Sequence, residues 1–209
     1  MPAAALRIGL TGGIGSGKST VSALLVAHGA GLVDTDAIAH RLTQPQGAAV
    51  EAIRAAFGAA AIAADGAMDR AFMRALAFGD DGTARRRLEA ILHPLIGAET
   101  ERQAGAATVS APALVFDVPL LVESGRWRAR VSRVLVIDCS AETQMARVLQ
   151  RPGWTRERVE GALAAQTTRQ ARRAAADAVL LNDGLALVTL RNEVMSLAAR
   201  WGCETMTPP

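Results

Sequence analysis

One segment of the chain has the residue types and the spacing that bind a nucleoside triphosphate. Residues 12–19 read Gly-Gly-Ile-Gly-Ser-Gly-Lys-Ser and satisfy the pattern G-x-x-x-x-G-K-[ST]. Glycines let such a loop curl until its backbone N–H groups point at phosphate oxygens, and the following helix N-terminus adds partial positive charge. Lys18 would reach the β- and γ-phosphates, and the Ser19 hydroxyl would complete a Mg²⁺ shell. The alternative is a glycine-rich turn with an incidental lysine, yet Lys18 is the only lysine in the chain.

The elements around this segment match the pattern. Residues 6–11 form an apolar run, and from Lys18 to about residue 27 the apolar side chains recur at helical spacing. A strand that enters the loop and a helix that leaves it are the context that phosphate binding requires. We therefore assign nucleotide binding to Gly13, Ile14, Gly15, Ser16, Gly17, Lys18, Ser19 and Thr20.

Further apolar runs indicate a parallel sheet. They are short, and the last four end at an acidic or amide residue, as buried parallel strands at the edge of a site often do. Strands separated by helices favour parallel pairing with right-handed crossovers. The expected strands cover residues 6–11, 32–33, 113–116, 134–137 and 178–181.

Two longer segments are expected to be helical. Residues 37–110 hold Ala-rich helical patterns, and about seventy residues are too many for a loop. Later, a helix over about 141–150 ends at Pro152, and Thr155 is a good N-cap for a second helix. We expect an α/β protein with the P-loop NTPase fold, in which a five-stranded parallel sheet is flanked by helices. Residues 1–209 form one domain: a core sheet at about 6–36, 113–140 and 177–200, a helical substrate lobe at about 37–110 and a helical lid at about 141–173.

The composition excludes several classes of protein. Of the 209 residues 50% are apolar, which is enough to build a core, and the formal net charge of +3 is too small for a typical nucleic-acid binder. No apolar run reaches the roughly 20 residues that cross a bilayer, and the start does not read as a signal peptide. Cys139 and Cys203 have neither metal-like nor disulfide spacing and read as core thiols. We expect a cytoplasmic protein that acts on a small molecule, with no membrane, nucleic-acid or obligatory protein partner.

The acceptor of the phosphoryl group would lie opposite the nucleotide. Asp34 and Asp36 follow the second strand, at the carboxyl edge where open α/β sheets bind ligands. One carboxylate could orient an acceptor hydroxyl and take its proton. The other could cap the helix that begins near Ala37. The residues alone leave open which aspartate has which role.

Seven motifs follow one another over nearly the whole chain, at residues 9–21, 34–39, 93–96, 117–123, 142–147, 165–169 and 182–184. This ordered set resembles the dephospho-coenzyme A kinase family. That family phosphorylates the ribose 3′-hydroxyl of dephospho-CoA with ATP and Mg²⁺, the last step of coenzyme A biosynthesis. The resemblance implies the same reaction here, on a P-loop sheet with a CoA-binding lobe and a lid.

The resemblance also implies roles for single residues. Asp36 matches the catalytic base, and Arg147 matches the lid arginine that acts with Lys18 on the transferring phosphate. Asn182 and Gly184 lie where the family binds adenine. The acceptor contacts that it implies are Thr11, Asp36, His40, His93, Leu120 and Glu123.

Several of these residues have a structural alternative. Asp117 ends a strand, as the magnesium-binding aspartate of P-loop proteins does, but it could equally cap the next helix. His93 precedes Pro94 and could simply close a helix. Arg147 and Arg151 share one face of the first lid helix, and we expect lid closure to deliver Arg147 to the phosphate. On the second lid helix Arg169, Arg172 and Arg173 form a cluster that could be catalytic or merely solvated.

Two positions depart from the family pattern. His40 stands where the family usually has arginine, and Arg151 is followed by Pro152 where an acidic residue is usual. The second departure concerns the geometry of the lid. If His40 takes over the grip on the acceptor's phosphates, only its protonated imidazole can do so, and the KM for the acceptor would then rise from about pH 6 to 8.5.

Two other functions compete with this interpretation. Another P-loop kinase, acting on a nucleoside monophosphate or a sugar, would need a base pocket or a compact sugar site that is not readable here. A GTPase-type switch would show an N-K-x-D motif, which is impossible because Lys18 is the only lysine.

Overall fold

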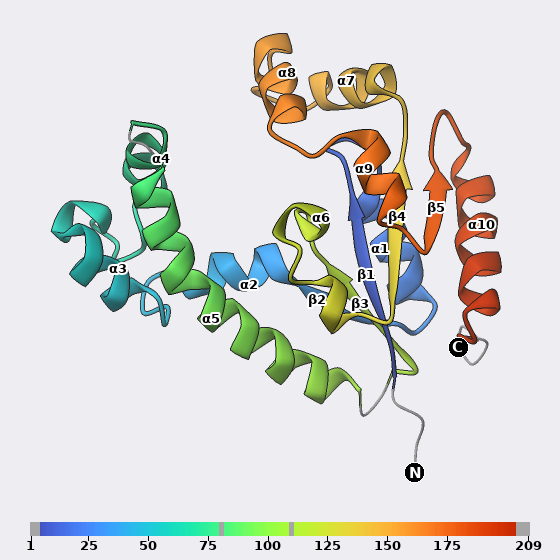
Figure 1. The fold of residues 1–209 in the computed structure, drawn as a ribbon, viewed down its shortest axis with the longest axis horizontal. Helices are drawn as coiled ribbons and strands as arrows, with labels where there is room; N and C mark the ends of the chain where they lie inside the picture. The colour runs from blue at the N-terminus through green and yellow to red at the C-terminus, as the bar shows by residue number, and fades with distance from the viewer. Residues whose placement is uncertain (1–4, 80–81, 109–110, 204–209) are drawn as a thin grey trace. The chain divides into compact units, whose positions relative to one another are not determined.

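The computed structural model describes residues 5–79, 82–108 and 111–203 and contains a five-stranded parallel sheet. The strand order is β2-β3-β1-β4-β5, so the glycine-rich loop leaves the middle strand (Figure 1). The expected strands are confirmed with small changes in their ends: β1 (Leu6–Gly12), β2 (Gly31–Asp34), β3 (Ala113–Asp117), β4 (Arg133–Asp138) and β5 (Ala178–Leu181).

The register brings the polar strand ends together at one edge. Leu10 of β1 pairs with Asp117 of β3 and with Leu135 of β4, and Asp138 at the end of β4 pairs with Leu181. Burial explains why the interior of these strands is almost purely aliphatic. Two helices, α1 (Lys18–Ala27) and α10 (Leu187–Arg200), pack against each other and complete this core. The core side chains include Ile8, Leu10, Val21, Leu25, Val115, Leu135, Ile137, Leu190 and Val194.

Residues Asp34–Gly105 form a second compact unit that is almost entirely helical. Its small core is built from Ala49, Ile53, Ala61 and Met73. The idea that Pro94 closes a helix is wrong, because the last helix of this unit continues through it; apolar side chains on both sides of the proline pack on the core and hold the helix. The helices are α2 (Thr35–Leu42), α3 (Val50–Phe57), α4 (Arg70–Gly79) and α5 (Thr83–Ala107), with a 3₁₀ turn at Ala59–Ala61.

The lid segment holds three helices rather than two. Helices α7 (Ala141–Leu149) and α8 (Arg156–Ala164) lie beyond the carboxyl end of β4 (Figure 1). Thr155 caps α8, as predicted, by accepting a hydrogen bond from the Arg158 N–H. The expected single second helix is wrong, because Thr168 accepts from the Ala171 N–H and starts α9 (Arg169–Ala174). Arg169, Arg172 and Arg173 therefore lie on α9.

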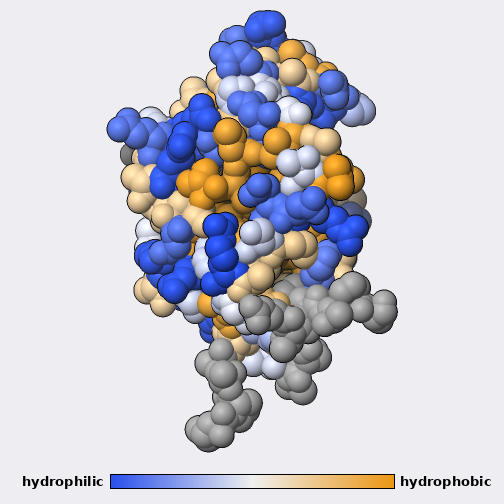
Figure 2. Space-filling view, turned by 90° about the vertical axis from the view of Figure 1, so that its right-hand side faces the viewer, coloured by the Kyte–Doolittle hydropathy of each residue, from blue (hydrophilic) through white to orange (hydrophobic). Residues whose placement is uncertain are grey.

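A short helix and a 3₁₀ turn connect β3 to β4: α6 (Leu121–Ser124) and Arg128–Arg130. Within the described ranges, no helix has the length and apolar character to cross a membrane. Figure 2 shows the face that carries α10, where apolar residues gather between hydrophilic ones. A groove of about 410 Å³ between α1 and α10 is lined there by Leu24, Ala27, His28, Leu187, Val188 and Arg191.

Candidate active site

The glycine-rich loop connects the end of β1 at Gly12 to the start of α1 at Lys18. Gly15 and Gly17 have φ angles of 76° and 94°, in the left-handed region that glycine adopts without strain. Gly17 is also the N-cap of α1, and a Cβ built on it would lie 2.3 Å from Nδ2 of Asn182. Backbone conformation and close packing therefore both require glycine at position 17.

The loop offers backbone donors to an anion. Within the described part of the chain, the backbone N–H groups of Gly15, Gly17, Lys18 and Ser19 donate no hydrogen bond. These donors lie at the N-terminus of a ten-residue helix, whose dipole favours negative charge. The arrangement fits the phosphate groups of a nucleotide, as the sequence pattern predicts.

Lys18 is paired with Asp117. Its ammonium contacts Oδ1 of the aspartate, and both side chains are largely buried. The carboxylate does not cap the next helix, because the N-cap of α6 is Leu120. The capping alternative for Asp117 is thus removed, and its carboxylate lies beside the loop lysine. Ser19 and Thr20 occupy the first turn of α1 and are exposed.

Two side chains hold the carbonyl groups of the loop. Nη1 of Arg147 lies 3.2 Å from the Gly15 oxygen and 3.3 Å from the Ser16 oxygen. The buried Asn182 donates from Nδ2 to the Ser16 oxygen at 2.8 Å. Arg147 therefore contacts the loop already in this structure, from the last turn of α7, and does not depend on lid closure to reach it. Asn182 serves the loop backbone here, and Gly184 follows it in a turn with a φ of 69°.

Two glutamines bind the same residue of the loop. Nε2 of Gln144 donates to the Ile14 oxygen at 2.7 Å, and Oε1 of Gln166 accepts from the Ile14 N–H at 3.0 Å. Sequence reasoning gave neither glutamine a role. The available signal was their place inside two of the family motifs.

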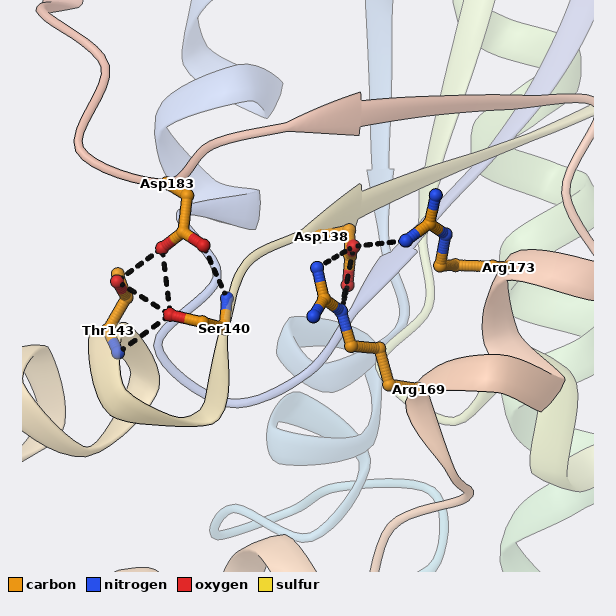
Figure 3. A network of polar contacts seen from close by, with 6 residues as sticks. All are labelled: Asp138, Ser140, Thr143, Arg169, Arg173 and Asp183. Atoms are coloured by element: carbon orange, nitrogen blue, oxygen red, sulfur yellow. Dashed lines mark hydrogen bonds and ion pairs between the residues drawn. The ribbon is translucent and has the colours of Figure 1, made fainter.

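A buried carboxylate organises two of the three arginines of α9 (Figure 3). Asp138, only 4% exposed, receives Nε and Nη2 of Arg169 at 2.7–2.9 Å, and Arg173 lies 3.6 Å away. The hydrogen bonds that Arg169 donates to Asp138 raise the pKa of the Arg169 guanidinium. Arg172 is buried and donates to the Thr167 oxygen at 2.6 Å. The three arginines are therefore not merely solvated: Arg169 and Arg173 anchor α9 to the end of β4, and Arg172 bonds to the segment just before α9.

A second carboxylate, that of Asp183, anchors the start of α7 (Figure 3). Ser140 caps the helix by accepting from the Thr143 N–H, and its own N–H and hydroxyl donate to Asp183 at 3.0 Å. The Thr143 hydroxyl donates to the same carboxylate. These donors, Thr143 first, hold the pKa of Asp183 below its usual range. The turn after β5 and the start of the lid are thus tied together.

In the helical unit, the structure separates the two candidate aspartates. Oδ1 of Asp34 accepts from the Ala37 N–H at 2.9 Å and caps α2. Asp36 lies in the first turn of α2, is exposed, and lines a pocket of about 470 Å³. The cap is therefore Asp34, whereas Asp36 lines the pocket. The same pocket has apolar walls and two arginines: Met68, Met73, Leu88, Leu92, Arg70 and Arg74.

His40 lines this pocket and contacts Arg70. Nη2 of Arg70 donates to Nδ1 of the imidazole, and Nε2 of Gln44 lies 3.3 Å from the same nitrogen. Since a guanidinium has donors only, Nδ1 is the acceptor in this contact. His40 therefore holds Arg70 at the pocket, and a direct grip of His40 on the acceptor's phosphates stays a prediction.

The other predicted acceptor residues have structural partners or lie outside this pocket. The buried Thr11 donates to the Pro119 oxygen at 3.2 Å, and Glu123 accepts from the Thr167 N–H at 2.9 Å. Leu120 is 47% exposed. His93 is half-buried in α5 and does not line the pocket of Asp36.

Comparisons with known proteins agree with the fold. A model of the dephospho-CoA kinase family matches residues 6–187. The chain belongs to the dephospho-CoA kinase family. A dephospho-CoA kinase from Burkholderia thailandensis is 59% identical over 194 residues, which cover 93% of this chain and 94% of that one.

Two solved structures are similar to this dephospho-CoA kinase family member. A Thermus thermophilus protein is 32% identical with a TM-score of 0.82, over 94% of this chain and 98% of that chain. A dephospho-CoA kinase from Campylobacter jejuni is 23% identical with a TM-score of 0.69, over 93% of this chain and 96% of that chain, and supports the fold. The chain is an enzyme, a kinase that phosphorylates dephospho-CoA in coenzyme A biosynthesis.

The main residues that sequence reasoning missed in this kinase are the pocket arginines. Arg70 and Arg74 are four residues apart and share one face of α4. Asp69 precedes them and accepts from the Phe72 N–H at 2.8 Å, a helix-start pattern that is readable in the sequence. That pattern could have placed both arginines on one face, although it could not show that His40 lies against Arg70.

Proposed function

We propose that the enzyme transfers the γ-phosphoryl group of ATP to the ribose 3′-hydroxyl of dephospho-CoA, giving coenzyme A and ADP, as the last step of coenzyme A biosynthesis. The observation that carries this proposal is the different placement of the two aspartates at the start of α2. Asp34 caps the helix, and Asp36 faces a pocket with two arginines. A carboxylate placed this way can serve a hydroxyl on a molecule that also carries phosphates.

In the reaction, Asp36 accepts the proton of the 3′-hydroxyl as the oxygen attacks the γ-phosphorus. The new P–O bond forms while the bond to the β–γ bridging oxygen breaks, and the electrons of that bond leave with ADP. Negative charge spreads over the equatorial oxygens in the transition state. Lys18 and Arg147, which both lie at the glycine-rich loop, stabilise this charge.

Residues 13–20 bind the phosphates of ATP, and Asn182 and Gly184 border the adenine. Ser19 and Asp117 fit Mg²⁺, because the ion takes oxygen ligands and the Asp117 carboxylate lies beside the loop lysine rather than on a helix end. When bound, Mg²⁺ would neutralise charge on the β- and γ-phosphates. Lys18 would then exchange Asp117 for phosphate oxygens.

The acceptor lies against α2, α4 and α5. Arg70 and Arg74 bind its phosphates, and the apolar wall takes less polar parts of the molecule. His40 contributes to acceptor binding indirectly, because it holds the guanidinium of Arg70 in place. Further acceptor contacts come from Thr11, His93, Leu120 and Glu123.

For the parts of the chain we propose the roles that the sequence predicts. The sheet carries the nucleotide, residues 37–110 carry the acceptor, and the lid over residues 141–173 excludes water when ATP is bound. The enzyme works on small molecules in the cytoplasm.

An assay with matched acceptors tests this function. ADP release is measured with dephospho-CoA, with 3′-deoxy-dephospho-CoA, with AMP and with water alone. We expect turnover with dephospho-CoA only, and a product that carries a 3′-phosphate by ³¹P NMR. Equal turnover of the 3′-deoxy analogue would place the phosphate elsewhere, equal turnover of AMP would indicate a nucleotide kinase, and hydrolysis with water alone would indicate an NTPase.

A further inference from the structure

Both polar groups of one loop residue are bound by lid side chains. The Ile14 N–H donates to Gln166, and the Ile14 oxygen accepts from Gln144, at 3.0 and 2.7 Å. Gln144 lies in the first turns of α7, and Gln166 lies just past the end of α8. The two ends of the α7–α8 hairpin thus meet on a single residue of the phosphate loop.

The chemistry fixes the orientation of both amides. A backbone N–H needs an acceptor, so Gln166 must present Oε1, and a backbone oxygen needs a donor, so Gln144 must present Nε2. Gln144 is only 5% exposed, so loss of its bond would leave polar atoms buried without a partner. The two contacts are therefore complementary and specific, unlike a solvated surface pair.

The loop also packs directly on α7. A Cβ added to Gly13 would lie 2.3 Å from Nε2 of Gln144, and one added to Gly15 would lie 2.9 Å from the backbone oxygen of the same residue. A side chain at position 15 would therefore meet the backbone of α7, and one at position 13 would displace the Gln144 amide from the Ile14 oxygen. The lid base and the loop form one packed unit.

We propose that Gln144 and Gln166 form a clamp of positioning residues that holds the phosphate loop in its ATP-binding shape before ATP arrives. The Ile14 N–H is taken by Gln166, while the N–H groups of Gly15, Gly17, Lys18 and Ser19 remain available. Fixing residue 14 removes backbone freedom immediately before these donors, so less entropy is lost when phosphate binds. The proposal rests on the proposed binding of ATP by residues 13–20.

The first experiment removes each hydrogen bond while keeping side-chain volume. In Gln144→Met and Gln166→Met, we expect the Kd of a non-hydrolysable ATP analogue, measured by calorimetry, to rise about 2- to 10-fold. The KM for dephospho-CoA and the kcat at saturating ATP should change little. Gln150→Met is the matched control, because Gln150 is an exposed glutamine at the end of the same helix, and its analogue affinity should equal that of the wild type.

Amide hydrogen exchange gives a readout that does not depend on activity. The Ile14 N–H should be protected without nucleotide in the wild type and exposed in Gln166→Met. If that protection is lost and the affinity for the analogue is unchanged, the clamp is only structural and the proposal is wrong. Affinity losses equal to that of Gln150→Met would overturn it as well.

Glutamate variants cover the case in which the methionine variants do not fold. Gln166→Glu keeps an acceptor for the Ile14 N–H, whereas Gln144→Glu loses the donor for the Ile14 oxygen. At high salt, which screens the added charge, Gln144→Glu should bind the analogue more weakly than Gln166→Glu. Equal affinities would contradict the clamp. Wild-type analogue affinity in Lys18→Ala would instead contradict the proposed function, because the loop would then not be the ATP site.

Discussion

In the proposed function, the phosphate loop and the acceptor pocket bind phosphate groups by different means. The loop uses backbone N–H groups at a helix N-terminus, and side chains such as Gln144, Arg147 and Asn182 hold its carbonyl groups. The pocket would use side chains directly, namely Arg70 and Arg74, which line it together with apolar residues.

This difference explains where sequence variation can be tolerated. A backbone donor cannot be replaced by substitution, so the loop depends on glycine conformation and on its supporting side chains. A side-chain grip can change its members, as His40 in place of the usual arginine illustrates. Removal of Lys18, the one charged side chain of the loop, should therefore cause a large loss of ATP binding and turnover. Removal of a single side chain of the pocket should weaken acceptor binding by a smaller amount.

The largest effect is expected for Lys18→Ala. Turnover should fall by at least about 10³-fold, because a transition-state charge loses its partner, and ATP binding should weaken strongly. No second lysine exists to replace it. Steady-state kinetics and calorimetry with the ATP analogue measure both effects. A variant with near wild-type turnover would refute the assignment of the loop.

Asp36→Asn should lower kcat by about 10²–10⁴-fold, the usual contribution of a positioned base. The Kd for ATP should be unchanged, because Asp36 belongs to the acceptor pocket. Asp34→Asn is the matched control, and it should be mild because asparagine is as good an N-cap as aspartate. A damaging Asp34→Asn beside a mild Asp36→Asn would show that the base and the cap are reversed.

The difference between the two regions also explains how much the sequence could predict. The loop is local: eight consecutive residues, a strand before them and a helix after them define it. Strands such as β4 and β5 are predicted closely because they are aliphatic runs that end at Asp138 and Asn182. The boundary between α8 and α9 was missed because Thr168 acts as a cap within a segment that otherwise reads as helical.

The supporting contacts could not be predicted, because they join residues far apart in the chain. Gln144 and Gln166 lie 130 and 152 residues from Ile14, and Arg70 lies 30 residues from His40. Residue type restricts such partners only weakly, since an amide or a guanidinium can bond to any suitable group. Tertiary packing decides which pairs form, and a single sequence does not report it.

The third prediction concerns the side-chain grip itself. Arg70→Met should raise the KM for dephospho-CoA about 10- to 100-fold, as expected for the loss of a charge-assisted hydrogen bond, and leave the KM for ATP unchanged. Arg85→Met is the control, because Arg85 lies on α5 in the same unit and pairs at the surface with Glu89. If both variants behave alike, Arg70 does not bind the acceptor.

His40 distinguishes two forms of this grip by its response to substitution. As the acceptor that holds Arg70, it can be replaced by asparagine, so His40→Asn should leave the KM for dephospho-CoA near the wild-type value. His40→Leu loses the acceptor and should raise that KM several-fold. A KM that rises equally in both variants and falls below the wild-type value in His40→Arg would instead support the cationic role expected from the sequence.

The smallest effect on activity is expected at Asp183, because several other side chains hold the phosphate loop directly. Asp183 accepts from Thr143 and Ser140, and these bonds hold its pKa below the usual range. The folded state therefore favours the ionised carboxylate. Its stabilising contribution is fully present above the unfolded pKa of about 3.9 and is lost as the pH falls through the lower folded value.

Asp183→Asn should accordingly lower the Tm by a few degrees near neutral pH, and the difference from the wild type should shrink below about pH 4. Activity at saturating ATP should change little, because Gln144, Arg147 and Asn182 still hold the loop. Thr143→Val removes the largest cause of the shift, so the Asp183 carboxyl should titrate closer to its ordinary range by NMR. An unchanged titration in that variant would show that the network does not set the charge of Asp183, and the lid would then be anchored mainly by Asp138 and Arg169.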